Sequence, residues 1–277
     1  MRFGVLALAC VGCGRVGFDS VVDAAFATPV ALAELNSPVV DDDPSLTGDM
    51  LEIYFASHRS GTEQLYRATR NTVTEPWSAP APVPELNTSD INNPKVSLDG
   101  LTLVFASSRT PNAGNNDIWI ATRPDRYSAW SPRHLDELAT VEDDFEPYLV
   151  ASDALELFFG RSMGSDSDIW SATRSTTADA FGNAVPLVEL DAPVYDGGTW
   201  VNAPRTLLMF HSTRSGASSD IYYSTRSRGA ETWSAPLSFA DFNTEANESD
   251  AWMSPDGRTF VFVSNRDGDD NLYIATR

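Results

Sequence analysis

Short runs of alternating apolar and polar residues, separated by polar turns, cover most of the chain. The stretch 254–277, SPDGRTFVFVSNRDGDDNLYIATR, shows the unit clearly. A tight turn at Asp256-Gly257 precedes an alternating apolar strand, and a second polar turn precedes a strand that ends at Thr276-Arg277. Because no segment keeps a helical period, the pattern predicts an all-β fold.

This unit occurs five times. The four earlier copies read LEIYFASHRSGTEQLYRATR, LTLVFASSRTPNAGNNDIWIATR, LELFFGRSMGSDSDIWSATR and TLLMFHSTRSGASSDIYYSTR. Successive copies are 50, 54, 51 and 52 residues apart when their central phenylalanines are aligned: Phe55, Phe105, Phe159, Phe210 and Phe262. A period near fifty with about four short strands per unit indicates a β-propeller rather than a helical solenoid or a sandwich.

A second motif, rich in proline, suits the outer edge strand of a blade, where a missing backbone donor costs no hydrogen bond. Its copies are FATPVALAELN, WSAPAPVPELN, WSPRHLDELAT, FGNAVPLVELD and WSAPLSFADFN. The folded region therefore begins with an outer strand and ends after the third strand of its last unit. We expect Phe26–Asn36 to pair with Leu272–Arg277 and to close a ring of five blades over residues 26–277.

The repeated hairpins also carry a family resemblance. The last copy, together with FASSR and DIWIATR in the second copy, resembles the TolB-type, WD-like β-propeller repeats of bacterial envelope proteins. The resemblance implies the propeller fold. It does not imply one activity, because propellers serve as partner-binding scaffolds, enzyme gates and catalytic domains.

The N-terminal sequence MRFGVLALACVGCGRVGFDS has an arginine followed by an apolar run too short to span a bilayer as a helix. It resembles a bacterial lipoprotein signal peptide, which implies cleavage and acylation at Cys13, or at Cys10. A signal peptide over residues 1–13 and a tether over 14–25 then place the protein in the cell envelope, and Gly14 implies the outer membrane. A secretory signal without lipidation is the alternative.

Charge and cysteine content narrow the function classes. The 277 residues include 39 acidic and 19 basic side chains, for a formal net charge of −20. This charge repels phosphate backbones and anionic membranes, so we expect no nucleic-acid partner and membrane contact only through a lipid anchor. Both cysteines precede the repeats, so the folded region has no disulfide, thiolate metal site or cysteine nucleophile.

The loops that lead into the innermost strands are rich in acidic residues and predict one acidic face of the ring. Immediately before the five inner strands, at the rim of the central channel, we expect Asp43, Asn93, Glu146, Gly198 and Asp250. Converging carboxylates suit Ca²⁺ binding, or the acid and base of glycoside cleavage as in five-bladed furanosidases. The structural alternative is ion pairing with the arginines that end the second strands: Arg59, Arg109, Arg214 and Arg266.

The third repeat departs from this arginine pattern. It has Met163 where the other repeats have arginine, and it carries Arg161 two positions earlier. Glu146 would then lack an arginine partner, which gives it the strongest functional case among the channel carboxylates.

Two tryptophans are predicted near the start of innermost strands, Trp200 in the fourth repeat and Trp252 in the fifth. An aromatic ring beside carboxylates at a concave mouth suits sugar stacking, and buried packing is the alternative. The histidines have no metal-ligand spacing, so we expect surface or turn positions for them: His58, His134 and His211.

No phosphate-binding glycine loop and no nucleophile elbow is present. We therefore favour a monomeric, non-catalytic propeller that binds a protein or glycan through its acidic face. The alternative is a carbohydrate-active hydrolase that uses Asp43, Glu146 and Asp250. We assign no metal or cofactor, and a Ca²⁺-stabilised scaffold is a third hypothesis. The predicted ligand-binding residues are Asp43, Asn93, Glu146, Trp200, Asp250 and Trp252.

Overall fold

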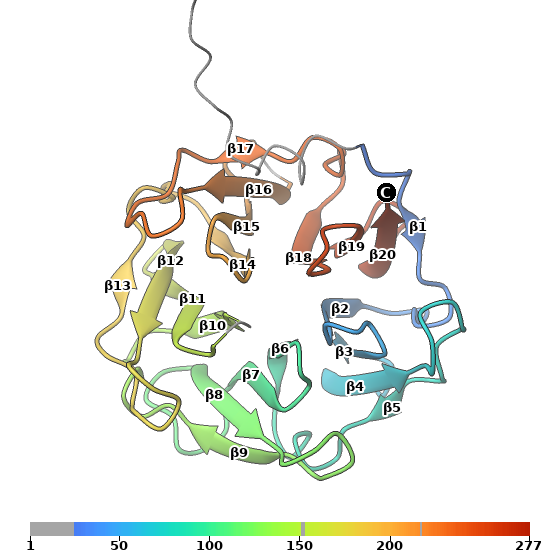
Figure 1. Ribbon diagram of the computed structural model, residues 1–277, viewed down its shortest axis with the longest axis horizontal. Coiled ribbons are helices and arrows are strands. Elements are labelled where there is room, and N and C mark those ends of the chain that lie inside the picture. Colours follow the sequence, from blue (N-terminus) through green and yellow to red (C-terminus); the bar gives the residue numbers. More distant parts are fainter. Residues whose placement is uncertain (1–24, 151–152, 217) are drawn as a thin grey trace, which may run out of the picture.

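A computed structural model describes residues 25–150, 153–216 and 218–277. Over these ranges the chain forms five antiparallel four-stranded sheets, arranged as blades around a central axis (Figure 1). The prediction of an all-β, five-bladed propeller is confirmed. The predicted signal peptide, Cys10, Cys13 and nearly all of the tether lie outside the described residues.

The first strand of each blade is innermost. Blade 1 contains β2 (Asp41–Leu46), β3 (Glu52–Ser57), β4 (Gln64–Thr69) and β5 (Ala81–Pro82). Blade 2 contains β6 (Asn92–Val96), β7 (Thr102–Ser107), β8 (Asp117–Thr122) and β9 (Ser131–His134). Blade 3 contains β10 (Asp144–Leu149), β11 (Glu156–Met163), β12 (Asp166–Thr173) and β13 (Val185–Pro186). Blade 4 contains β14 (Asp196–Val201), β15 (Leu207–Ser212), β16 (Asp220–Thr225) and β17 (Leu237–Ser238).

Blade 5 joins the two ends of the folded region. It contains β18 (Glu248–Met253), β19 (Thr259–Ser264), β20 (Asn271–Thr276) and, at its outer edge, β1 (Val30–Ala31). Val30 pairs with Ile274, and Ala31 pairs with Tyr273. The predicted closure by the N-terminal segment is therefore confirmed.

The aligned phenylalanines form the blade cores. All five are fully buried on the second strands, and four of them pack on a tyrosine or tryptophan of the third strand with ring centroids 5.9–6.3 Å apart. Rings of this size remove a large apolar area from water, which explains why the repeat keeps an aromatic residue here.

Each blade contains two arginines that pack on its aromatic rings. The upper arginines lie over the core phenylalanine and donate to a loop carbonyl before the inner strand; they are Arg59, Arg109, Arg161, Arg214 and Arg266. The lower arginines lie 4.1–4.5 Å from the centroid of an outer aromatic ring; they are Arg70, Arg123, Arg174, Arg226 and Arg277. A guanidinium over an aromatic face stabilises both the ring packing and the loop it bonds.

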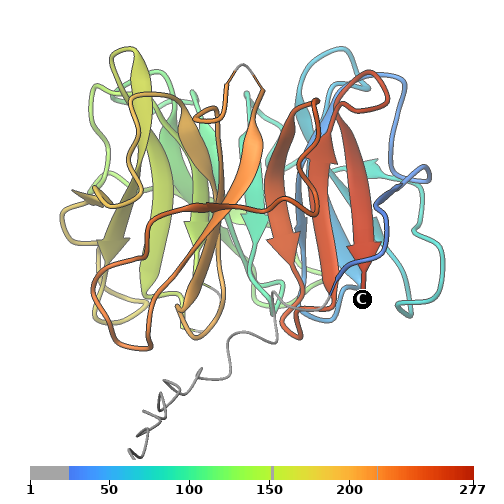
Figure 2. The same cartoon turned by 90° about the horizontal axis from the view of Figure 1, so that it is seen from above.

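The antiparallel blades give the ring two faces (Figure 2). The lower face, on which the C-terminus lies, carries the turns between first and second strands and the loops between third and outer strands. The upper face carries the turns between second and third strands and the loops that lead into the inner strands. No helix among the described residues is long and apolar enough to cross a membrane.

Candidate functional site

The innermost strands share an irregularity that shapes the channel. In each blade the pairing between the innermost and the second strand shifts register. The innermost strand has one extra residue at the shift, as in a β-bulge. The residue at the bulge has a positive φ, between 50° and 63°. These residues are the predicted channel positions, Asp43, Asn93, Glu146, Gly198 and Asp250. They lie inside the strands, and the expectation that they precede the strands is wrong.

Side chains from all five blades form a closed polar ring in the channel. The backbone N–H and side-chain amide of Asn93 donate to Asp43 at 3.1 Å, and the side-chain oxygen of Asn93 accepts from the N–H of Glu146 at 3.3 Å. His211 Nε2 lies 3.6 Å from Glu146 Oε1, and the N–H of Asp250 contacts His211 Nδ1 at 3.5 Å. Asp43 and Asp250 complete the ring, with carboxylate oxygens that lie within 4.8 Å of one another. We call these five residues the channel ring.

Lys95 supplies positive charge beside the channel ring. Its ammonium group is 3.5 Å from Asp43 and 3.4 Å from Asp250, and its side chain is buried. It is the only lysine of the chain. The nearby carboxylates raise the pKa of Lys95 despite the opposing effect of burial, so the ammonium stays charged.

His211 takes the place of the missing fourth-blade side chain. Gly197 and Gly198 leave room that the other blades lack, because a Cβ at Gly197 would overlap the Glu146 carboxylate and one at Gly198 would overlap the His211 imidazole. His211 projects into that room from β15 and is 5% exposed. The expectation of a surface or turn position is therefore wrong for His211.

The same expectation also fails for His134, which is 7% exposed and lies 3.4 Å from Asp117. His58, with a side chain 46% exposed, is at the surface as expected. The position of His211 could have been recognised in the sequence, but only after the second strands of all five repeats are aligned residue by residue. Ala56, Ala106, Gly160 and Val263 stand where β15 has His211, so a large polar residue at this position occurs only beside the glycine pair.

Burial and neighbouring charges shift the pKa values of the three carboxyl groups of the channel ring in different directions. Burial raises the pKa of Asp43 well above its usual value, and the charge of Asp250 adds to this effect. Burial acts in the same direction on Asp250, but the charges of Lys95 and His211 outweigh it and hold that pKa at about 2. Burial also raises the pKa of Glu146, against the opposing charge of His211. Asp43 and Glu146 therefore keep a proton to higher pH than ordinary carboxyl groups, while Asp250 stays ionised.

Glu146 has one satisfied and one unsatisfied oxygen. Its Oε1 accepts a hydrogen bond of 3.0 Å from the hydroxyl of Tyr195, whereas its buried Oε2 has no hydrogen-bond partner among the described residues. The Tyr195 ring stacks on His211, with centroids 5.5 Å apart and planes 7° from parallel. Tyr195 thus caps both residues from the upper side of β14.

The upper arginines pair with other carboxylates than those of the channel ring. The partners lie two residues before the bulge, in the pairs Arg59–Asp41, Arg161–Asp144, Arg214–Asp196 and Arg266–Glu248, at 2.6–3.0 Å. Arg161 makes the same contacts in blade 3 from its shifted position. As expected, Glu146 itself has no arginine partner among the described residues, because Arg161 pairs with Asp144.

The channel ring offers oxygen and nitrogen ligands for a cation. Glu146, His211 and Asp250 have potential ligand atoms within 4.8 Å of one another, as do Asp42, Asp43 and Asp250. A site that mixes imidazole and carboxylates suits transition metals better than Ca²⁺, which prefers oxygen ligands alone. The Lys95 ammonium already neutralises part of the Asp43 and Asp250 charge.

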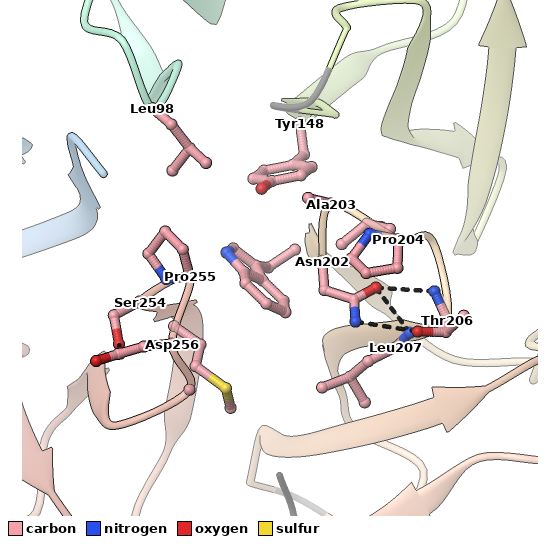
Figure 3. A pocket seen from close by; sticks show the side chains of 14 residues that line it. Leu98, Tyr148, Asn202, Ala203, Pro204, Thr206, Leu207, Ser254, Pro255 and Asp256 are labelled. Atoms are coloured by element: carbon pink, nitrogen blue, oxygen red, sulfur yellow. Dashed lines mark hydrogen bonds between the residues drawn. The ribbon is translucent and has the colours of Figure 1, made fainter. Parts of the chain in front are cut away.

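An apolar cavity of about 370 Å³ opens at the lower end of the channel (Figure 3). Tyr148, Trp200, Leu98 and Pro255 contribute to its wall from four different blades. Trp200 thus lies at the end of its strand, away from the upper mouth, and the expected position near the strand start is wrong. Trp252, 2% exposed, also lies near the end of its strand and belongs to the hydrophobic core.

Fold and channel together define the class of protein, a five-bladed β-propeller with a closed polar ring in its channel. No protein-family model and no curated protein matches the chain. A protein assigned as TolB from Agrobacterium tumefaciens is similar in structure, with a TM-score of 0.53 and 15% identity over 85% of this chain and 76% of that one. TolB from Acinetobacter baumannii has a TM-score of 0.51 and 14% identity over 88% of this chain, which covers only 56% of that protein.

A second group of similar structures consists of glycoside hydrolases. The catalytic domain of the GH62 α-L-arabinofuranosidase from Coprinopsis cinerea has a TM-score of 0.63 and 12% identity, over 91% of this chain and 96% of that domain. At this level of identity the likeness shows a shared propeller fold. Function has to be argued from the site.

Proposed function

We propose that this chain is a non-catalytic β-propeller of the bacterial cell envelope that binds a protein or glycan partner through its upper face. The closed state of the channel ring carries this proposal. Asp43, Glu146 and Asp250 are only 2%, 6% and 4% exposed. Oxygens of Glu146 and Asp250, and of Asp43 and Asp250, lie within 4.8 Å of each other, whereas the two carboxylates of a glycosidase are about 5–9.5 Å apart to accommodate the sugar.

The charge of the upper face supports a binding role. Its loops and turns carry these partly or fully exposed acidic residues: Glu63, Asp90, Glu142, Asp143, Asp166, Asp191, Glu245, Asp267, Asp269 and Asp270. The arginines nearby are the upper arginines, which are engaged within the blades. A surface of one sign steers a partner of opposite charge and raises its association rate, so the partner should present a basic or otherwise cationic surface.

Neutralising the upper face tests this role. In the triple variant Asp90→Asn, Glu245→Gln, Asp269→Asn, all three changed side chains are exposed. We expect the variant to capture at least about tenfold less partner than the unchanged chain from envelope extract at low salt. The matched control neutralises Glu75, Asp179 and Glu231 in lower-face loops and should retain capture. Equal capture by both triple variants would contradict an upper-face site.

Hydrolysis is the second candidate, because the pKa values of the channel carboxylates are pushed apart as in acid–base pairs. Under this hypothesis Glu146 acts as the acid, Asp250 as the ionised carboxylate and Asp43 as a modulator of their charges. A chromogenic arabinofuranoside tests it directly. Turnover that disappears in Asp250→Asn, while the thermal midpoint is unchanged, would replace the binding proposal. We expect no turnover above background.

The envelope location rests on the N-terminal sequence. We propose acylation of Cys13, with Cys10 as the alternative site, and an outer-membrane anchor. Mass spectrometry of the mature N-terminus identifies the acylated cysteine. Changing Cys13 to Ser should release the protein from the membrane fraction, whereas unchanged fractionation of both single variants, Cys13→Ser and Cys10→Ser, would refute the anchor.

A further inference from the structure

A groove crosses the boundary of blades 1 and 2 toward the lower face. Two cavities, of about 480 and 340 Å³, adjoin there because both are lined by Arg67, Thr69, Arg126 and Tyr127. Tyr127 stands in the loop between β8 and β9 and is 99% exposed. An aromatic side chain this exposed contributes nothing to the core, and it stands between two hollows of the surface.

The charged residues that line the groove are mostly arginines, in contrast to the acidic composition of the whole chain. The charged residues in its walls are Arg67, Arg70, Arg123, Arg126, Glu52 and Glu85. The walls thus contain more arginines than acids, although the chain has a net charge of −20. An anionic ligand in this groove gains electrostatic free energy that the upper face would deny it.

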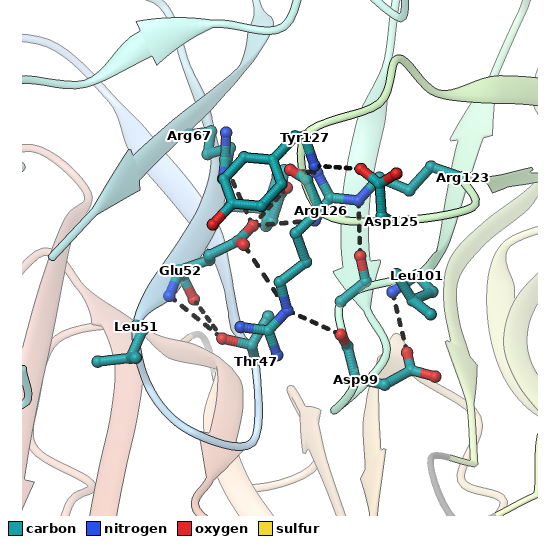
Figure 4. A network of polar contacts seen from close by, with 12 residues as sticks. Thr47, Leu51, Glu52, Arg67, Asp99, Leu101, Arg123, Asp125, Arg126 and Tyr127 are labelled. Atoms are coloured by element: carbon teal, nitrogen blue, oxygen red, sulfur yellow. Dashed lines mark hydrogen bonds and ion pairs between the residues drawn. The ribbon is translucent and has the colours of Figure 1, made fainter. Parts of the chain in front are cut away.

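Three arginines converge on one carboxylate at the centre of the groove (Figure 4). Arg67 Nε and Arg123 Nη2 each donate to Glu52 Oε2 at 3.0 Å, and Arg126 Nε lies 3.8 Å from Glu52 Oε1. Burial acts to raise the pKa of Glu52, but the hydrogen bonds from Arg67 and Arg123 outweigh it and lower that pKa. Glu52 is therefore ionised; together with Asp49, which pairs with Arg126 at 2.6 Å, it places two negative charges against the three guanidinium groups.

Arg67 has N–H donors that its hydrogen bond to Glu52 does not use. Its Nε is used by Glu52, while its two Nη groups have no hydrogen-bond partner in the part of the chain that the structure describes, and its side chain is 32% exposed. Arg126 uses Nη1 for Asp49 and Nε for the carbonyl of Asp99. A guanidinium with free parallel N–H groups binds a carboxylate in two-point fashion.

We propose that this groove binds an acidic saccharide, with a sugar ring against Tyr127 and carboxylates on Arg67 and Arg126. An extended acidic peptide fits less well, because it would need a free strand edge for its main chain. The free strand edge beside the groove is β5, which is two residues long and includes Pro82, so it offers little main chain for pairing with a peptide. A saccharide needs only the ring face and the guanidinium groups. This site is separate from the upper face proposed above.

Calorimetric titration of the full chain with two sugars tests the proposal. The first is a β-1,4-linked trimer of mannuronate, and the second is β-1,4-mannotriose, which has the same linkage without carboxylates. We expect saturable binding of the acidic trimer and binding of mannotriose at least about tenfold weaker. Tyr127→Ala should weaken binding of the acidic trimer by about tenfold, a typical effect for an interface tyrosine.

The controls separate a specific site from general charge attraction. Val141→Ala, at an 82% exposed position in an upper-face loop, should leave the affinity unchanged. Arg67→Gln should weaken binding while the thermal midpoint is followed, so that a folding defect is recognised; Tyr127→Ala is free of this difficulty because its side chain is exposed. Absent saturation, equal affinity for mannotriose, equal affinity for triglutamate, or a Tyr127→Ala variant with unchanged affinity would each overturn the proposal.

Discussion

A pair of glycines and one histidine decide what the fourth blade contributes to the channel. Gly198 has no side chain to add to the ring, and His211 reaches the same space from the neighbouring strand. The exchange keeps the ring closed while replacing an acid by a group that is positive when protonated. The charge of His211 lowers the pKa of both Glu146 and Asp250; burial still raises that of Glu146, whereas Lys95 adds to His211 in lowering that of Asp250.

The raised pKa of Glu146 predicts a specific pH dependence. A carboxyl whose folded-state pKa exceeds its unfolded value stabilises the fold at low pH, and this stability is lost as pH rises through the folded pKa. Glu146→Gln stays neutral and avoids the loss. We expect its thermal midpoint, relative to the unchanged chain, to rise from pH 4 to pH 8 in calorimetric scans.

The control for this prediction is Glu245→Gln, which removes an exposed carboxylate of the upper face. Its thermal midpoint should follow that of the unchanged chain at every pH. A Glu146→Gln difference that is constant with pH would show that Glu146 is not neutral at low pH and charged at high pH within the folded channel.

The upper arginines also permit a comparison between blades. Arg214 pairs with Asp196, which is 1% exposed, whereas Arg109 has no carboxylate partner among the described residues because Ile91 stands at the corresponding place. Arg214→Met should destabilise the fold by about 3–5 kcal/mol, since it leaves a buried charge unpaired. Arg109→Met should cost clearly less in urea unfolding. Equal losses would mean that the carboxylate adds nothing to the repeated arginine packing.

At the scale of elements, β1 holds the ring together through more than its two paired residues. Asn36 exchanges two side-chain hydrogen bonds with the backbone of Leu272, and Phe26 packs on Phe242 with centroids 5.1 Å apart. The lower arginine of blade 5, Arg277, lies over the Phe26 ring. The strand β1 is thus one part of a longer segment, residues 26–36, that holds blade 5 together. We call this segment the clasp.

Truncation tests the clasp. A chain that starts at Ser37 should lose at least about 3 kcal/mol of unfolding free energy relative to one that starts at Phe26, because it loses buried aromatic contacts and exposes the edge of β20. Removing residues 1–25 alone should have little effect. Similar thermal midpoints for the two truncations would show that blade 5 is stable with three strands.

The repeat made the fold predictable down to the pairing of the ends. The spacing of phenylalanines such as Phe55 and Phe105 counts blades directly, and an unfinished last blade leaves a single partner for its edge. The site was less predictable because it depends on exact register. The carboxylates were found, but a bulge inside each strand moves Trp200 to the lower cavity, and His211 reaches the ring from a different strand than its counterparts.

At the scale of the whole molecule, positive charge is placed where it offsets the large acidic excess. Lys95 lies beside the channel ring, the upper and lower arginines lie within the blades, and Arg67 and Arg126 line the lower groove. The arginines near the acidic loops of the upper face are the upper arginines, which are engaged within the blades. This arrangement predicts weaker partner binding at high salt for the upper face and for the groove alike.

Metal removal tests whether the channel needs a bound cation. Lys95 already contacts Asp43 and Asp250, and the raised pKa values of Asp43 and Glu146 reduce the tendency of these groups to carry charge. We therefore expect the same thermal midpoint with and without EDTA. A fall on chelation that is reversed by added Ca²⁺ or Mn²⁺ would establish a metal-stabilised ring, because a ligand that binds only the folded state raises its stability.

The pairing of Val30 with Ile274 also has a consequence for the order of folding. Strands this far apart in the chain meet only after a large loss of chain entropy, so ring closure depends on the last strand rather than the first. During synthesis or export from the N-terminus, four blades can assemble while the clasp segment still lacks its partner. The ring therefore closes only after all five repeats are present. A chain that stops before β20 keeps an unpaired strand edge, which cellular quality control can recognise.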